Sequence, residues 1–206
     1  MPELSNIQTY EKLNGADYQL ILDRFKSVLQ RLDLWNNEVK QAFDEFVWKV
    51  EDDGFVYSSI TQLGHFKTKF SDILVRPLVM VYTPVIDKTN TDNWIACDLL
   101  IEAEKLRSFE TGNYHKTTYD FVKALTLEMH KEFKQTGIYF TDEAQDGQDF
   151  DGFRNINKEK LWQFDYAIIP LTLQKTYSSP PLTHKIIHHN NYLEAWYIDR
   201  WTPDEK

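Results

Sequence analysis

The sequence is poor in cysteine and has no long hydrophobic run. Its 206 residues contain one cysteine, Cys97, so an internal disulfide framework is excluded and the cytoplasm is the expected compartment. No apolar run approaches the roughly 18 residues that a membrane-spanning helix needs, so we expect no membrane association. The first residues, Met-Pro-Glu-Leu-Ser, lack the basic start and apolar core of a secretory signal peptide, and none is expected.

Basic residues are also in the minority. The chain has 23 Lys and Arg against 32 Asp and Glu, a formal net charge of −9 with histidine neutral. Proteins that grip phosphate backbones need clustered Lys and Arg, so we expect no direct sequence-specific nucleic-acid binding. Aromatic residues, in contrast, make up 15% of the chain and hydrophobic residues 42%. This composition predicts a globular protein, which we divide into one domain over residues 1–180, helical in its first 53 residues, and a C-terminal extension over 181–206.

Three segments have the apolar period of an amphipathic helix. They cover residues 17–32, 38–51, and a stretch from Thr117 or Thr118 to Gln135, and Gly137 is expected to stop the third. Asn14 or Asp17 is expected to cap the first, and Asp52-Asp53-Gly54 to end the second. The expected buried stripes are Leu20, Ile21, Phe25, Val28, Leu29 and Leu32; Val39, Phe43, Phe46, Val47 and Val50; and Phe121, Val122, Leu125, Met129 and Phe133.

Six segments read as strands because they are short and rich in β-branched or aromatic residues, or alternate with period two. They cover residues 55–60, 65–70, 78–82, 94–104, 138–140 and 161–175. Pro77 and Pro84 are expected at the margins of 78–82, which should form a hairpin with 94–104, and Pro170 suggests a bulge or an open edge. The prediction is therefore an α+β fold, with two N-terminal helices and one central helix packed on a mainly antiparallel sheet.

The C-terminal histidines are the first candidates for chemistry. His184, His188 and His189, together with Glu194 or Asp199, could supply metal ligands. Their spacing matches no zinc-binding pattern, so ordinary surface or strand-end histidines are the favoured interpretation.

Other possible chemistries match less well. His115-Lys-Thr117 and Thr183-His184 resemble the paired His-x-Thr motifs of cyclic-phosphodiesterase and RNA-ligase-like proteins, but only the first has the right order, and Thr117 is explained as a helix cap. Residues 142–151 hold five carboxylates, yet their spacing fails the EF-hand pattern and indicates a solvated loop. No phosphate-binding glycine loop, serine elbow or Cys-x-x-Cys occurs, and Cys97 should be an inert buried thiol. We expect no catalytic residue, no cofactor and no metal.

The order of the central segments is similar to that of a known family. Arg76-Pro-Leu-Val-Met-Val-Tyr82 leads through a polar turn to Asp92-Asn-Trp94 and a second strand, and a helix and a closing strand, Leu161-Trp-Gln-Phe-Asp-Tyr-Ala-Ile168, follow. This pattern resembles the tail-terminator, or tail-completion, proteins of long-tailed bacteriophages. The resemblance covers a little over half of the chain. It implies a small α+β subunit with one or two helices on a face of its sheet, assembled into a six-membered ring at the head-proximal end of the tail tube. It carries over no functional residue.

These observations lead to a ranked set of functional hypotheses. The first is a virion structural protein, a tail terminator or neck-type subunit of a phage head–tail connection that acts through protein–protein contacts and is assembled in the host cytoplasm. The alternatives are a cytoplasmic partner-binding protein, such as a toxin-neutralising immunity protein with an acidic surface, and a small histidine-dependent hydrolase. Trp196, Tyr197 and Trp201 are the candidate partner-binding residues, because aromatic side chains dominate interfaces. The extension that carries them either packs on its own sheet or docks on a neighbour.

Overall fold

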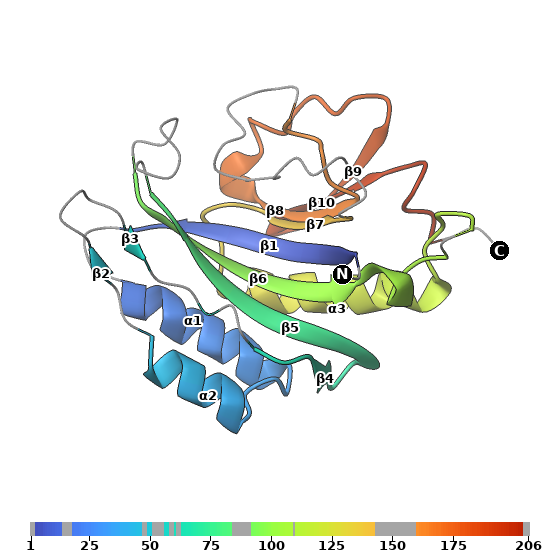
Figure 1. Ribbon diagram of the computed structural model, residues 1–206. Helices are drawn as coiled ribbons and strands as arrows, with labels where there is room; N and C mark the ends of the chain where they lie inside the picture. Colours follow the sequence, from blue (N-terminus) through green and yellow to red (C-terminus); the bar gives the residue numbers. More distant parts are fainter. Residues whose placement is uncertain are drawn as a thin grey trace.

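Ten strands and three α-helices make up the part of the chain that the structure, a computed structural model, describes (Figure 1). The described residues are 3–13, 18–46, 49–50, 56–57, 60, 63–83, 92–108, 110–142 and 160–203. Eight strands form one sheet in the order β4-β5-β6-β1-β7-β8-β10-β9, and every neighbouring pair in it is antiparallel. This is the α+β fold that the sequence predicted. The elements are β1 (Leu4–Lys12), α1 (Tyr18–Arg31), α2 (Asn37–Asp44), β2 (Lys49–Val50), β3 (Val56–Tyr57), β4 (Phe66–Thr68), β5 (Ser71–Tyr82), β6 (Trp94–Glu102), α3 (Lys116–His130), β7 (Ile138–Thr141), β8 (Tyr166–Pro170), β9 (His184–His188) and β10 (Tyr192–Tyr197), with short 3₁₀ turns at Ala103–Lys105 and Leu171–Leu173.

The hairpin of β5 and β6 is confirmed, but β5 begins earlier than expected and contains Pro77. Val79 exchanges both of its backbone hydrogen bonds with Ile60, on the side of β5 away from β6. Backbone groups alternate along a strand, so the nitrogen of Pro77 also points away from β6. The proline therefore removes no hydrogen bond from the β5–β6 ladder, which is why it is tolerated inside the strand.

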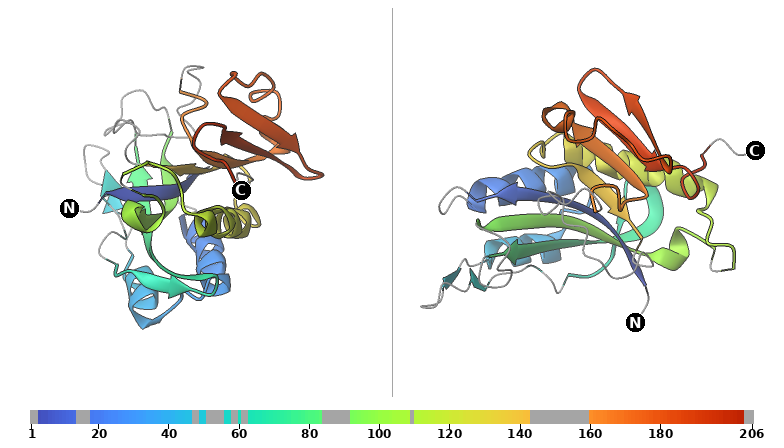
Figure 2. Two further views of the ribbon diagram at one scale, coloured as in Figure 1. Left: turned by 90° about the vertical axis from the view of Figure 1, so that its right-hand side faces the viewer. Right: turned by 90° about the horizontal axis from the view of Figure 1, so that it is seen from above.

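The two faces of the sheet bury different cores. On one face, α1 and α3 cover the inward side chains of β5, β6, β1, β7 and β8, among them Val79, Leu99 and Ile7 (Figures 1 and 2). On the other face, residues from the two segments that flank β8 in the sequence cover a smaller core. This second core comprises Tyr139, Leu161, Phe164, Ala167, Ile169, Tyr177, Leu193 and Ala195.

The first two helices are confirmed as a pair, although the second is shorter than expected. Asp33 has φ 61°, and the Leu34 amide donates to the Leu29 carbonyl, which is the left-handed exit that ends α1. Asn36 caps α2 by accepting from the Val39 amide. The helix ends at Asp44 and residues 49–50 are strand, so the predicted extension to residue 51 is wrong.

The buried stripe of α1 differs from the predicted one at two positions. It contains Leu22, whereas Leu20 is 60% exposed. The expected caps of α1 and the Asp52-Asp53-Gly54 stop lie outside the described residues.

The central helix buries the predicted stripe but has different ends. Phe121, Val122, Leu125, Met129 and Phe133 are all buried. The N-cap residue is His115 rather than a threonine, and Thr118 instead donates its hydroxyl to the Leu106 carbonyl. The helix ends at His130, so Gly137 does not stop it. Gly137 lies beside the Tyr139 ring, where a Cβ atom would come within 2.4 Å of that ring, and this close approach requires glycine.

Strands at both ends of the chain join the sheet, contrary to the sequence-based division. The N-terminal region is not helical throughout, because β1 pairs with β6 on one side and with β7 on the other. The expected C-terminal extension supplies β10 and β9, which continue the sheet beyond β8. The predicted strand over 161–175 is shortened to β8, which ends at Pro170. None of the helices in the described ranges is long and apolar enough to cross a membrane.

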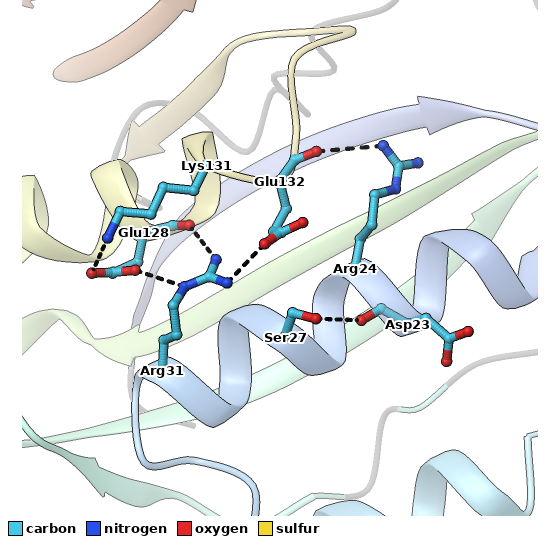
Figure 3. A network of polar contacts seen from close by, with 7 residues as sticks. All are labelled: Asp23, Arg24, Ser27, Arg31, Glu128, Lys131 and Glu132. Carbon is cyan, nitrogen blue, oxygen red and sulfur yellow. Dashed lines mark hydrogen bonds and ion pairs between the residues drawn. The ribbon is translucent and has the colours of Figure 1, made fainter.

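A network of ion pairs joins α1 to α3 at one end of these helices (Figure 3). Arg31 binds Glu128 at 2.9 Å and Glu132 at 2.7 Å, and Lys131 also binds Glu128, at 2.7 Å. Arg24 reaches the Glu132 carbonyl. Burial raises the pKa of Glu128, but hydrogen bonds from Lys131 and Arg31 outweigh it and hold that pKa below its usual value. The network holds the two helices in a defined register over the sheet.

Replacing Leu125 by alanine tests the packing of α3. The side chain is fully buried between the helix and the sheet, so we expect Leu125→Ala to lower the free energy of unfolding by about 2–5 kcal/mol. Leu20→Ala is the matched control, because this leucine is 60% exposed on α1, and it should change stability by less than about 0.5 kcal/mol. Urea unfolding followed by circular dichroism measures both; equal effects would contradict the assigned helix face.

Candidate functional site

The three candidate partner-binding aromatics do not form one surface. Trp201 is 4% exposed and lies in the core, stacked on Tyr166 with ring centroids 4.7 Å apart. Trp196 and Tyr197 are half-buried neighbours in β10 and therefore point to opposite faces of the sheet. Trp196 packs against the core beneath the helices, whereas the ring of Tyr197 lies 5.3 Å from that of His184. Trp201 is thus a core residue in this fold, and binding of a partner through Trp196 or Tyr197 stays a prediction.

A cluster of buried charged groups lies where five chain segments meet. Asp142, just after β7, contacts Arg107 Nε at 2.6 Å and Arg200 Nη2 at 2.8 Å. Arg200 also reaches Asp165 Oδ1 at 3.4 Å, and Asp165 accepts a hydrogen bond from the Tyr114 hydroxyl. Arg107 further pairs with Glu3, in front of β1, at 2.7 Å. Both aspartate side chains in this cluster are fully buried.

The electrostatics of the buried cluster are strongly perturbed. Burial raises the pKa of Asp165 to about 6, against the opposing effects of Arg200 and of the Tyr114 hydroxyl. Burial, together with the neighbouring carboxylate of Asp165, also raises the pKa of Tyr114 well above its usual value. Such shifts occur at catalytic sites and also in structural ion-pair networks. Since both aspartates are fully buried, the cluster is best explained as an internal tie between segments.

Sequence reasoning missed most of this cluster. The prediction that Asp142 begins a solvated loop is wrong, because two arginines from distant segments pair with it; the rest of the acidic stretch, 143–151, including the weighed calcium pattern, lies outside the described residues. Asp165 stands between Phe164 and Tyr166, and Arg200 stands before Trp201. A single charge within an aromatic run was the available signal of a buried ion pair.

A second polar cluster is centred on Glu194 of β10. Its carboxylate accepts from Lys123 Nζ at 2.7 Å, from the Tyr166 hydroxyl at 2.8 Å, and contacts His189 Nε2 at 2.8 Å. Burial raises the pKa of Glu194, but the hydrogen bonds from Lys123 and Tyr166 outweigh it and lower that pKa. His189 and Glu194 are among the residues weighed from the sequence as possible metal ligands, although ordinary histidines were the favoured interpretation, and the structure brings these two together.

The other histidines do not converge on that pair. His184 donates from Nε2 to the Phe164 carbonyl, and its Nδ1 lies 3.0 Å from the Thr183 hydroxyl oxygen. The His184 ring packs on Trp162 over the second core. His115 starts α3, which covers the opposite face of the sheet, so the two His-x-Thr-like segments do not face each other. Within the described residues, no group of three or more His, Cys, Asp or Glu side chains is placed to hold a metal ion. Cys97 is buried in β6, and burial raises the pKa of its thiol well above the usual value.

Exposed apolar side chains gather at the two outer edges of the sheet. We call β9 with Leu182 and Ile198 the β9 edge, and β4 with Phe70 and Leu74 the β4 edge. Among the described residues, the large apolar side chains with substantial exposure are Leu20, Phe70, Leu74, Leu171, Leu182, Ile187 and Ile198. All but Leu20 and Leu171 lie at one of these two edges, which are therefore the candidate interaction surfaces.

The pH dependence of stability tests the assignment of Asp165. Its pKa is about 6 in the folded protein, raised from 3.8, so the folded state holds a proton that the unfolded chain has lost between these pH values. This group therefore lowers the free energy of unfolding as pH rises from about 4 to about 6, by about 3 kcal/mol. Asp165→Asn should remove that decline, so the difference in unfolding free energy between variant and wild type should change across this window. A constant difference from pH 4 to pH 7 would show that Asp165 titrates normally.

No family model matches the chain, and no curated protein or solved structure is significantly similar to it.

Proposed function

We propose that this protein is a structural subunit of a bacteriophage head–tail connection, a tail terminator or a neck-type protein, that acts through protein–protein contacts in a ring. The observation that carries the proposal is the arrangement of the segments that resemble tail terminators. The β5–β6 hairpin and the β7–β8 pair belong to one antiparallel sheet, and α3 packs with α1 on one face of it (Figure 2). The proposal is supported by this α+β arrangement, because the resemblance implies an α+β subunit with helices on a face of its sheet.

The polar clusters are consistent with a structural role. Within the Asp142 cluster, and separately within the Glu194 cluster, the charged groups form ion pairs with each other. These ion pairs join segments that are distant in sequence. The exposed apolar groups, in contrast, lie at the edges of the sheet, where they are available to other protein chains. Exposed apolar groups at the edges of the sheet suit a subunit that works by assembly.

Sedimentation velocity and negative-stain electron microscopy of the untagged full-length protein test the proposal. We expect a closed ring, and six subunits is the number that the resemblance implies. A protein that stays monomeric at high concentration, and that binds neither tail-tube nor neck proteins, would overturn the assignment.

The net charge of −9 favours one alternative, a partner-binding protein such as a toxin-neutralising immunity protein. Such a protein would be monomeric and would form a salt-sensitive complex with a basic toxin. Neighbouring genes distinguish the two functions at little cost. Portal, capsid and tail-tube genes favour the head–tail subunit, and an adjacent toxin gene favours the immunity protein.

A further inference from the structure

Two contacts join α3 to the last two strands at the outer end of the sheet. We call residues 184–197 the β9–β10 hairpin, which forms that end (Figure 1). Lys123 of α3 binds Glu194 of β10 at 2.7 Å. About two helical turns further along α3, and therefore on the same helix face, the ring of His130 lies 5.5 Å from the ring of Tyr192. The hairpin is thus attached to the helix at two points, one through an ion pair and one through rings.

Side chains of the hairpin connect these two points to each other. The ring of Tyr192 stacks on the ring of His189, with centroids 4.4 Å apart, and His189 Nε2 lies 2.8 Å from Glu194 Oε2. The contacts therefore run from one point on α3 through the hairpin and back to α3. We call this circuit the hairpin latch, and its members are His130, Tyr192, His189, Glu194 and Lys123. Because each member is positioned by its neighbours, displacing one of them loosens the others.

His130 is the member of the latch that acid would disturb. The residue is 4% exposed, and Lys134 acts on it with a charge of the same sign as an imidazolium ion. Burial and Lys134 lower the pKa of His130, against an opposing effect of the Asn191 backbone. The carboxylate of Glu194, the acidic member of the latch, is already bound by three groups, Lys123, Tyr166 and His189. A proton on His130 would therefore place a positive charge in a buried site that disfavours it.

We propose that protonation of His130 opens the hairpin latch, so that mild acid loosens the β9–β10 hairpin from α3. This conformational device does not depend on the proposed ring assembly. The pKa of His130 lies below its ordinary value of 6.5 while the hairpin is docked, so docking favours the neutral ring. The contribution of His130 to docking is therefore complete above pH 6.5 and is lost as the pH falls below it. From pH 7.5 to pH 5.5, one such histidine can raise the opening constant of the hairpin by at most about tenfold.

Hydrogen exchange at the backbone amides of β10 tests the proposal, because exchange corrected for its intrinsic rate measures the opening constant. His130→Gln removes the titrating ring, and His188→Gln is the matched control, since His188 is an exposed histidine of the same hairpin. Between pH 7.5 and pH 5.5 we expect a several-fold larger rise of the opening constant in the wild type and in His188→Gln than in His130→Gln. Other groups with a shifted pKa in or beside the hairpin, His184, Asp165 and Glu194, are the same in all three proteins, so the difference isolates His130.

An equal rise of the opening constant in His130→Gln and in the wild type would overturn the proposal. An NMR titration of the wild-type protein gives a second test that needs no variant. The imidazole of His130 should titrate below pH 6.5, and its ring contacts with Tyr192 should weaken over the same pH range. Contacts between these two rings that persist after His130 is protonated would also overturn the latch.

Discussion

A chain that ends at Pro181 is expected to lose the cooperative unfolding transition of the full-length protein. The truncation removes β10 and β9, exposes the edge of β8, and removes Trp201 from the core between Tyr166, Tyr119 and Phe140. Loss of a buried tryptophan side chain alone costs about 3–5 kcal/mol, which is a large part of the about 5–15 kcal/mol that a domain has. Near-ultraviolet circular dichroism and thermal unfolding measure the loss. A truncated chain with an unchanged melting temperature would make the extension an appendage.

A single substitution isolates the contribution of the core from that of the lost strands. Trp201→Ala in the full-length chain should lower the free energy of unfolding by about 3–5 kcal/mol. Ile198→Ala, three residues earlier and 40% exposed, is the control and should cost less than about 1 kcal/mol. Similar losses from the two variants would show that Trp201 does not belong to the core.

Asp142→Ala is expected to be the most damaging change in the buried charged cluster. The fully buried carboxylate pairs with both Arg107 and Arg200, at 2.6 Å and 2.8 Å. Its removal leaves Arg107 paired with the half-exposed Glu3 and Arg200 with Asp165 at 3.4 Å. Breaking a buried ion pair in this way costs about 3–5 kcal/mol. Chemical denaturation at neutral pH measures this loss. Asp142→Asn should fall between wild type and Asp142→Ala, because the amide oxygen still accepts a hydrogen bond but carries no charge.

Asp72→Ala provides the matched control for that experiment. Asp72 also forms an ion pair, with Lys67 at 2.8 Å, but its side chain is 91% exposed. Solvent screens such pairs, so its removal should leave the unfolding transition unchanged within error. If Asp142→Ala were equally harmless, the charged cluster would not tie the segments together.

The local apolar pattern was sufficient to predict α1, α3 and the β5–β6 hairpin. In each of them the buried positions are apolar and recur with the period of one element, as with Phe25 and Val28 in α1 and Ile95 and Leu99 in β6. The hydrophobic effect acts on such a stripe wherever the rest of the chain lies. The α+β class could therefore be predicted from short windows of sequence.

β1 could not be predicted from such a window, because its positions on the helix face are mostly polar. Thr9 hydrogen-bonds with the hydroxyl of Thr136, and Glu11 forms an ion pair with Arg24 through Oε2. These partners come from other elements, and without them the buried polar groups would be costly. A sequence window around β1 shows a polar segment, and the residues that pair with its buried polar groups lie outside that window.

The same physical reason explains the candidate site and the C-terminal strands. The pairing of His189 with Glu194 could be expected because the residues are five positions apart in one hairpin. The burial of Asp142 between Arg107 and Arg200, and of Trp201 under Tyr119 and Tyr166, depends on segments that are brought together only by folding. The sequence by itself determined most of the residues that apolar periodicity buries in α1 and α3, Leu20 being an exception. Only the tertiary structure decided which polar and terminal segments joined them, because a buried charge or a sheet edge is stabilised by partners that lie far away along the chain.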